Sequence, residues 1–263
     1  MALFEKIEMP DVKKIIAVAS GKGGVGKSTV SVNLAIALAR KGLKVAIVDA
    51  DIYGPSIPRM FGIENEKPEG TSFGGKEFIL PIEREGVKIN SIGFFVSSKQ
   101  GLIWRGPMAA NAITQLFENT LWGETDVMII DFPPGTGDIQ LTTVQKLNLF
   151  GALIVTTPQE ISLNDARKAA SMFLNPGLKV PLLGVIENMS WFTPKPHPEE
   201  KYYLFGKDGG KKLAEEYDTD LLGQIPLVAE VGEDAEKGLS SFSNDNETIA
   251  KVFQDIANKL LKK

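Results

Sequence analysis

A glycine-rich segment near the start of the chain constrains its fold more than any other feature. The segment runs from Gly21 to Ser28 as G-K-G-G-V-G-K-S and fits the pattern G-x-x-x-x-G-K-[ST]. The apolar run 14–19 precedes it, and residues 28–40 follow it without Gly or Pro and with apolar residues at helical spacing. A strand, a glycine-rich turn and a helix in this order are typical of a phosphate-binding loop. The glycines let backbone N–H groups converge on phosphate oxygens at the positive end of a helix.

This loop predicts a binding site for ATP or ADP with Mg²⁺. Lys27 would reach the β- and γ-phosphates and act in catalysis, and the Ser28 hydroxyl would bind Mg²⁺. The residues expected to touch the nucleotide here are consecutive: Gly21, Lys22, Gly23, Gly24, Val25, Gly26, Lys27, Ser28 and Thr29. The alternative interpretation is a glycine-rich strand–helix turn that binds no ligand.

Composition favours a single globular domain, 1–263. Hydrophobic residues make up 43% and charged residues 24%, as in ordinary soluble folds. The net charge of −4 and the lack of basic runs argue against nucleic acid as a partner. No apolar stretch approaches the ~18 residues needed to span a membrane, and 1–14 lacks the apolar core of a signal peptide, so we expect a cytoplasmic protein. The chain has no cysteine, which excludes disulfides and thiolate metal sites.

Apolar runs alternate with segments of helical periodicity, which predicts a doubly wound α/β fold with a mostly parallel sheet covered on both faces. The expected strands are 14–19, 45–48, 127–130, 152–155, 182–186 and 221–225. The expected helices are 28–40, 107–119, 138–146, 163–174 and 248–263, with Asp138 as the N-cap of the third.

Two segments depart from this alternation. Residues 53–101 are rich in Gly and Pro, and within them 78–80 and 87–89 predict a short hairpin, in an insertion at about 70–95, beside the main sheet. Residues 189–210 form a long, polar, Pro-rich loop, which is typical of a functional or flexible segment.

Three carboxylates follow apolar strands, at the edge where open α/β sheets bind their ligands. Asp131 comes after four apolar residues, which is the Walker B arrangement, and we expect it to hold Mg²⁺. Asp49 and Asp51 are two residues apart, so on an extended chain they point to the same side. One could orient the attacking water while the other supports Mg²⁺ or the loop, or both could be solvated turn residues.

The turn 133–138, with the sequence P-P-G-T-G-D, directly follows Asp131. Two prolines and two glycines suit a stiff turn that presents a backbone N–H to the γ-phosphate and moves when that phosphate leaves. A plain strand–helix connector would have the same composition.

Together these residues resemble the deviant Walker A ATPases, the group that contains ParA, MinD, the nitrogenase iron protein and the Mrp-type (ApbC) iron–sulfur cluster carriers. The distinguishing residue is Lys22, which in that group reaches the nucleotide of a partner subunit, and which would otherwise be a solvated loop lysine. The resemblance implies a slow, dimer-dependent ATPase that works as a homodimer.

The Mrp-type carriers are the most similar members, over nearly the whole chain. The shared stretches are 20–29, 49–58, 104–108, 130–138, 187–190 and 205–210. The resemblance implies that Asp51 is catalytic, positions the attacking water and supports the metal, and that Asn188 and the segment around Pro226 contact adenine. Arg105 would sense phosphate, brace the dimer or form a surface ion pair.

The chain departs from the Mrp-type carriers at the position of their cluster ligands. Those carriers place Cys-x-x-Cys shortly after the Asn-Met-Ser stretch, and two subunits bridge a [4Fe–4S] cluster. Here Pro194 and His197 occupy the two positions in an ungapped count. Proline cannot ligate, and two imidazoles in place of four thiolates do not suit a [4Fe–4S] cluster. We therefore expect no cluster held in the family's way, and an ATPase that serves an iron–sulfur apoprotein, an assembly factor or another client.

Other functions are compatible with a P-loop fold. A positioning ATPase like MinD or ParA would act on a membrane or protein partner, and the apolar stripe of the 248–263 helix, beside several lysines, could lie on a membrane. The same stripe is typical of a surface helix packed on its own sheet, which makes a membrane the less favoured partner. The acidic balance disfavours a DNA partitioner, and the lack of a further acid/base pair disfavours a kinase or ligase.

Overall fold

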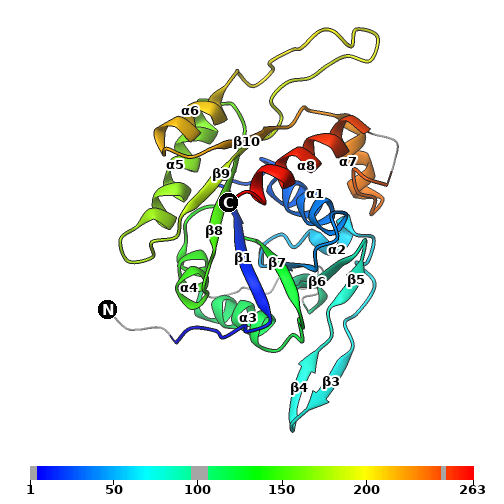
Figure 1. Ribbon diagram of the computed structural model, residues 1–263, viewed down its shortest axis with the longest axis vertical. Coiled ribbons are helices and arrows are strands. Elements are labelled where there is room, and N and C mark those ends of the chain that lie inside the picture. Colours follow the sequence, from blue (N-terminus) through cyan, green and yellow to red (C-terminus); the bar gives the residue numbers. More distant parts are fainter. Residues whose placement is uncertain (1–4, 96–105, 244–246) are drawn as a thin grey trace.

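The computed structural model describes residues 5–95, 106–243 and 247–263, and its centre is an eight-stranded sheet (Figure 1). The strand order is β10-β9-β8-β1-β7-β2-β6-β5, and only β5 runs antiparallel to its neighbour. The strands are β1 (Val12–Ala19), β2 (Val45–Asp49), β5 (Ile82–Arg84), β6 (Val87–Ser91), β7 (Thr125–Asp131), β8 (Gly151–Thr156), β9 (Leu182–Glu187) and β10 (Leu221–Gln224). The predicted doubly wound, mostly parallel sheet is confirmed.

Helices cover both faces of this sheet (Figure 1). One face carries α1 (Lys27–Ala39), α2 (Ile57–Met60), α7 (Ala229–Glu236) and α8 (Glu247–Leu260). The other face carries α3 (Gly106–Glu118), α4 (Asp138–Lys146), α5 (Glu160–Leu174) and α6 (Gly209–Glu216). Successive residues of β1 serve the two layers in turn, because Ile16 and Val18 belong to the first core and Ile15 and Ala17 to the second.

The parallel register brings the strand ends that carry polar residues to one edge of the sheet. Asp49 is paired with Asp131 across β2 and β7, and Asp131 is paired with Val18 of β1. The carboxyl ends of three neighbouring strands therefore meet where β1 turns into α1. This is the edge at which open α/β sheets bind ligands.

The prediction that residues 78–80 and 87–89 pair as one hairpin is wrong. Instead β3 (Gly70–Phe73) pairs with β4 (Lys76–Ile79) in a separate two-stranded sheet, and β5 pairs with β6, which joins the main sheet beside β2. Each pair is closed by two residues of positive φ, Gly74-Gly75 and Glu85-Gly86, as in tight type I′ hairpins. These two-residue turns were the sequence signal for two hairpins rather than one.

Several helix boundaries also differ from the prediction. Gly137 occupies the N-cap position of α4, and Asp138 is the first helical residue, where its charge favours the helix dipole. The short helices α2, α6 and α7 were not predicted, because eight or fewer residues give too few turns for a clear periodicity. A 3-10 turn, η1 (Ile92–Phe94), follows β6.

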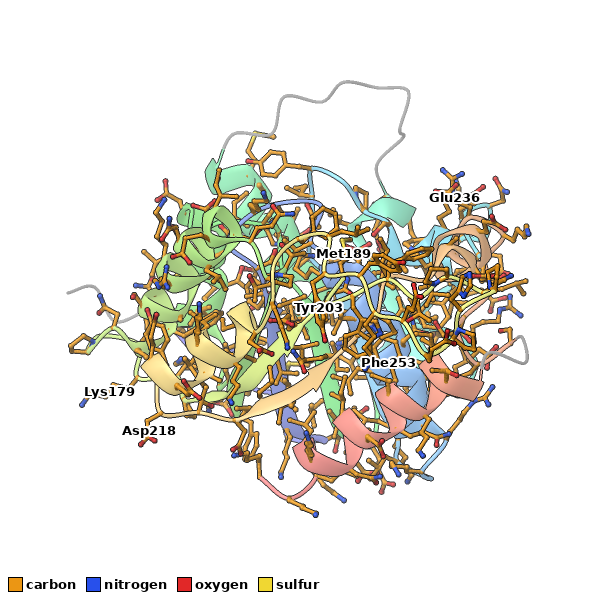
Figure 2. All side chains as sticks on the ribbon, turned by 90° about the horizontal axis from the view of Figure 1, so that it is seen from above. Lys179, Met189, Tyr203, Asp218, Glu236 and Phe253 are labelled. Atoms are coloured by element: carbon orange, nitrogen blue, oxygen red, sulfur yellow. The ribbon has the colours of Figure 1, made fainter. Side chains whose placement is uncertain are left out.

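The apolar stripe of α8 is buried against the protein itself. Ile249, Phe253, Ile256 and Leu260 are at most 4% exposed and belong to the core on the α1 side of the sheet. Phe253 lies on the side of α8 that faces the body of the molecule (Figure 2). The packed-helix interpretation is therefore the one that the structure supports. No helix among the described residues has the length and apolarity to span a bilayer.

We predict that Phe253→Ala lowers the free energy of unfolding by about 3–5 kcal/mol, because it empties a fully packed site between α8 and the sheet. Urea unfolding followed by circular dichroism measures this change. Lys251→Ala, at an exposed position of the same helix, is the matched control and should change the value by less than about 0.5 kcal/mol. A Phe253→Ala change as small as that of the control would mean that α8 does not pack as described.

Candidate nucleotide-binding site

The predicted phosphate-binding loop lies between the end of β1 at Ala19 and the start of α1 at Lys27. Gly24 and Gly26 have φ values of 80° and 83°, a region that favours glycine. A Cβ atom at Gly21 would come within 2.0 Å of the Asp165 backbone on α5, so the loop also requires glycine for close packing. The sequence and the backbone thus agree on a loop whose N–H groups are unobstructed by side chains.

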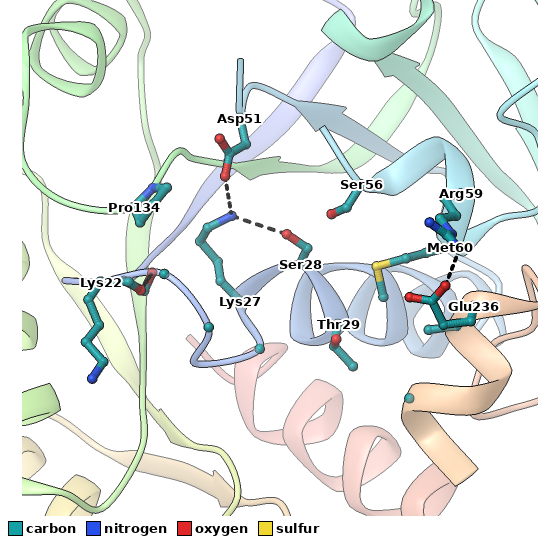
Figure 3. Close-up of a pocket in the computed structure, with 16 residues that line it drawn as sticks. Lys22, Lys27, Ser28, Thr29, Asp51, Ser56, Arg59, Met60, Pro134 and Glu236 are labelled. Carbon is teal, nitrogen blue, oxygen red and sulfur yellow. Dashed lines mark hydrogen bonds and ion pairs between the residues drawn. The ribbon is translucent and has the colours of Figure 1, made fainter. Parts of the chain in front are cut away.

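A cavity of about 370 Å³ opens beside this loop (Figure 3). Its lining combines residues of the loop and of α1 with residues of the β2–α2 connection, the β7–α4 turn, α2 and α7. The residues that line it are Ser20, Lys22, Gly23, Gly24, Gly26, Lys27, Ser28, Thr29, Asp51, Ser56, Arg59, Met60, Pro134, Gly232, Ala235 and Glu236. Six of the loop residues and Thr29, all predicted from the motif, therefore face one cavity. The contribution of α2 and α7 was missed, because neither helix was predicted.

Lys27 is the centre of the polar contacts in this cavity. Its amine lies 2.8 Å from Asp131 Oδ2 and 3.9 Å from Asp51 Oδ2. The Ser28 hydroxyl donates to the same Asp131 oxygen over 2.6 Å. The structure thus brings together Lys27, Ser28, Asp51 and Asp131, four of the five residues that the sequence assigned to catalysis and metal binding. The fifth, Lys22, is not part of this cluster.

Ser31 is a further contact that the sequence analysis missed. Its hydroxyl donates to Asp131 Oδ1 over 2.7 Å, so both carboxylate oxygens of the fully buried Asp131 are bonded to α1. Ser31 follows Lys27 by four residues, which places the two on the same face of a helix. That spacing was the available signal.

Asp49 and Asp51 have different environments. Asp49 is fully buried, and its carboxylate accepts from the Ser91 hydroxyl and from two backbone N–H groups. Burial, with the nearby charge of Asp131, raises the pKa of Asp49 to about 7. Burial also raises the pKa of Asp51, against the opposing effect of the Lys27 amine. Asp51 lines the cavity, whereas Asp49 lies behind it.

Lys22 lines the cavity, but its amine points away from Lys27 and Asp51 (Figure 3). The Lys22 side chain forms no hydrogen bond or ion pair within the part of the chain that the structure describes. The backbone carbonyl of Lys22 accepts a hydrogen bond from the Ser20 hydroxyl, and this bond holds the loop backbone. The lysine side chain is thus left available at the rim of the site.

The turn after Asp131 is tied to the phosphate-binding loop. The Gly135 N–H donates to the Ser20 carbonyl over 2.9 Å, and Gly135 has a φ of 92°. Pro134 lines the cavity together with Lys22 and Lys27 (Figure 3). The turn is therefore next to the loop, as its position after β7 indicated.

Asn188 and Pro226, for which adenine contacts were expected, do not line this cavity. The Asn188 side chain instead donates to the Val25 carbonyl over 2.9 Å and lies directly behind Gly26, where a Cβ atom would come within 2.1 Å of it. Pro226 is buried after β10. In this structure Asn188 supports the phosphate-binding loop from behind.

His197 lies far along the connection from β9 to α6, which projects from the sheet as an arm, residues 191–203 (Figure 1). Backbone bonds between Phe192 and Tyr202, of 2.8 and 2.9 Å, close the arm. His197, Glu199 and Glu200 bring potential ligand atoms within 4.8 Å of one another, and His197 and Glu199 are exposed. These residues do not line the nucleotide cavity. Arg105, the remaining candidate, lies outside the described residues.

Comparison with known proteins identifies the family. The model of the NUBPL iron-transfer P-loop NTPases, of the ParA group, matches residues 11–261. The chain belongs to this family.

Its relatives carry related descriptions. It is 46% identical over 260 residues to an iron–sulfur cluster carrier protein of Aquifex aeolicus, covering 98% of this chain and 70% of that protein. It is 48% identical over 252 residues to the carrier protein of Escherichia coli, covering 95% of this chain and 66% of that protein. An iron–sulfur protein required for NADH dehydrogenase in Arabidopsis thaliana mitochondria is 43% identical over 259 residues, covering 98% of this chain and 80% of that protein. The chain therefore spans about two thirds of the length of its bacterial relatives.

Solved structures agree with this placement. One is a nucleotide-binding protein of Archaeoglobus fulgidus, in a complex with ADP in which cobalt was found. It aligns with a TM-score of 0.75 at 37% identity over 87% of each chain. The cell division ATPase MinD of Pyrococcus furiosus aligns with a TM-score of 0.68 at 23% identity, over 95% of this chain and 98% of that one, which shows a shared fold. The family is thus a nucleotide-binding P-loop family concerned with iron transfer.

We predict that the nucleotide-free protein becomes less stable as the pH rises from about 5 to 7. The pKa of Asp49 is about 7 in the folded state and near 3.8 in the unfolded state. Between these values Asp49 is protonated in the folded state and ionised in the unfolded state, so the free energy of unfolding falls as the pH rises and the folded state loses this proton. The slope should reach up to about 1.4 kcal/mol per pH unit. Burial also raises the pKa of Asp51, so Asp51 contributes to the slope in the same direction, and a variant is needed to isolate the part due to Asp49.

Urea unfolding in EDTA at pH 5.5, 6.5 and 7.5 measures this slope. Asp49→Asn, which cannot ionise, should reduce the slope and leave only the part due to Asp51. An unfolding free energy that rises over this range, or an equal slope in the variant, would contradict the assignment to Asp49.

Proposed function

We propose that this protein is a Mg²⁺-dependent, ATP-hydrolysing dimeric switch of the cytoplasm that acts in iron–sulfur cluster assembly or transfer, without holding a cluster through thiolates. The observation that carries the nucleotide part is the convergence of Lys27, Ser28 and Asp131 at the end of an unobstructed glycine loop. This convergence unites a phosphate-binding amine with the oxygen ligands of a cation. The Archaeoglobus fulgidus neighbour, whose structure is a complex with ADP, supports an adenine nucleotide as the ligand.

The oxygen atoms in the site suit Mg²⁺. The Ser28 hydroxyl and the carboxylates of Asp131 and Asp51 are hard donors of the type that this cation prefers. When bound, Mg²⁺ would neutralise charge on the β- and γ-phosphates. Ser28 and Asp131 would hold it, and Asp51, which lines the same cavity, would support it.

The chain's own residues would perform hydrolysis by positioning and by charge. Lys27 is bonded to Asp131 and would turn its amine toward the phosphates, with the loop N–H groups around them. Oδ1 of Asp51 accepts from the N–H groups of Tyr53 and Gly54, both at 3.3 Å, which fixes the carboxylate. Its second oxygen, Oδ2, lies 3.9 Å from the Lys27 amine and would orient an attacking water once that amine turns toward the phosphates. A pre-oriented carboxylate and fixed N–H donors need little rearrangement as charge develops.

A second copy of the chain would complete this site. The Lys22 amine points away from its own cavity, as a residue that serves a partner's nucleotide would (Figure 3). Large apolar side chains are exposed on segments that follow the carboxyl ends of β2, β6 and β8, namely Tyr53 at 69%, Phe95 at 51% and, in the first turn of α5, Ile161 at 64%. Exposed apolar side chains that follow the nucleotide-binding edge of the sheet favour self-association that responds to the nucleotide.

The iron–sulfur part rests on the names and the similarity of the relatives, which are described as iron–sulfur cluster carrier proteins. Because the sequence contains no cysteine, this chain cannot bind a cluster through thiolate ligands. A role toward an iron–sulfur apoprotein or an assembly factor keeps the ATPase switch and leaves the cluster with the client. The alternative, a positioning ATPase on a membrane, loses its main sequence argument because the α8 stripe is buried.

We predict that Lys22→Ala and Lys27→Ala separate binding from hydrolysis. Lys27→Ala should abolish nucleotide binding, because it removes the amine at the centre of the site. Lys22→Ala should keep binding within about threefold and lose hydrolysis by about 10³-fold, the scale of a charge supplied by a partner. Calorimetry, phosphate release and size-exclusion chromatography with light scattering in ADP and in ATP measure these effects.

Lys13→Ala is the matched control, since Lys13 pairs with Asp126 near the start of β7, at the opposite edge of the sheet. Full hydrolysis by Lys22→Ala would refute the role in a partner's site. Absence of ATP binding by the natural protein would refute the proposed function as a whole.

We also predict that anaerobic reconstitution with iron and sulfide yields no stable dimer with four irons. The reason is that the two arms of a dimer would offer imidazoles and carboxylates instead of four thiolates. Iron and sulfide analysis with visible absorption after gel filtration measures this. A brown dimer that retains four irons would overturn the prediction that this protein holds no bridging cluster, while leaving the ATPase proposal intact.

A further inference from the structure

Asp49 is a buried acid that the proposed hydrolysis does not use. It is the last residue of β2, an interior strand that lies between β7 and β6, and it is fully buried. It does not line the nucleotide cavity, so it does not touch a nucleotide there. A buried carboxylate in the centre of a sheet edge costs free energy unless its oxygens are bonded, so the groups that it bonds indicate its role.

Both oxygens of Asp49 accept backbone N–H groups from the same segment. Oδ1 accepts from Asp51 over 3.2 Å, and Oδ2 accepts from Ile57 over 3.1 Å. Oδ2 also accepts from the Ser91 hydroxyl over 2.9 Å, which joins the group to β6. One carboxylate therefore fixes the first residue of the 51–57 segment and the residue at which α2 begins.

The segment between these two anchors forms one wall of the nucleotide cavity. It contributes Asp51 and Ser56, and α2 adds Arg59 and Met60 (Figure 3). The distance of 3.9 Å between the Asp51 carboxylate and the Lys27 amine depends on where this segment begins. A shift of about 1 Å in such a group can cost on the order of 100-fold in rate.

We infer that Asp49 is a positioning residue, which sets the Asp51 segment and α2 against the phosphate-binding loop through its two backbone contacts. This inference rests on the proposed ATP hydrolysis and specifies how its Asp51 is held. The carboxylate is required because both of its ends face N–H donors. Asparagine would present its own NH₂ group to one of them, either Asp51 or Ile57, and leave that contact unmade.

The test compares Asp49→Asn with Ser91→Ala. Asp49→Asn should lower kcat by about 10- to 100-fold, the usual effect of losing a partner that orients a functional group. Its Kd for ADP should stay within about threefold, because the loop and Lys27 are unchanged. Ser91→Ala removes only the hydroxyl and keeps both backbone contacts, so its kcat should stay within about threefold of the natural protein.

Amide hydrogen exchange, measured by nuclear magnetic resonance, provides the readout that a general loss of stability would not give. The N–H groups of Asp51 and Ile57 should be protected in the natural protein, and in Asp49→Asn residues 51–57 should exchange at least about tenfold faster while β1 does not change. If Asp49→Asn does not fold, exchange in the natural protein decides, and rapid exchange of both N–H groups overturns the inference.

Unchanged kcat in Asp49→Asn, or equal losses of kcat, ADP affinity and β1 protection, would also overturn it. Failure of the proposed function is a different result. In that case the natural protein itself would release no phosphate from ATP. The exchange rates of residues 51–57 in the natural protein and in Asp49→Asn would still show whether Asp49 holds this segment.

Discussion

The site depends on one buried ion pair, between the Lys27 amine and Asp131. The two groups are 2.8 Å apart, and their side chains are 6% and 0% exposed. Burying an ammonium and a carboxylate is unfavourable unless the remaining donors and acceptors are bonded. Ser28 and Ser31 supply those bonds to the two oxygens of Asp131. The pair therefore joins β7 to α1 and holds the Lys27 amine beside the phosphate-binding loop.

The parallel sheet explains why this pair can form. The register sets Val18, Asp131 and Asp49 side by side on β1, β7 and β2. The loop that follows β1 therefore meets the acids that follow β7 and β2, although these residues are far apart in the sequence. The arrangement places three acids near a single lysine, which is why burial and mutual repulsion raise the pKa of Asp49. The edge is suited to a cation bound together with a polyphosphate.

The parts that the sequence predicted are those with a local chemical signature. The glycine loop was predicted correctly because it requires φ values that few other residues adopt. The apolar strands were predicted correctly because continuous apolar runs of this length are typical of strands buried on both faces of a parallel sheet. The spacing of Ser31 from Lys27 placed the two residues on one helix face, but the bond from Ser31 to Asp131 and the role of Asp49 could not be predicted, since each depends on the sheet register. The wall formed by α2 and α7 was missed because short helices are stabilised by tertiary packing rather than by their own pattern.

The residues that follow β9 contact both the phosphate-binding loop and the segment after β10, and Asn188 makes the first of these contacts. Its side chain holds the Val25 carbonyl of the phosphate-binding loop, while two residues later Ser190 donates its N–H to Ile225 at the root of the arm. Glu187, just before it, is fully buried and accepts from Gly210 at the start of α6 and from Gln224 of β10. Loss of the Asn188 amide would loosen the loop behind Gly26 in addition to any contact with adenine. A weaker affinity for nucleotide in an Asn188 variant therefore does not by itself indicate a base contact, and comparison of adenine with guanine nucleotides is needed to separate support of the loop from recognition of the base.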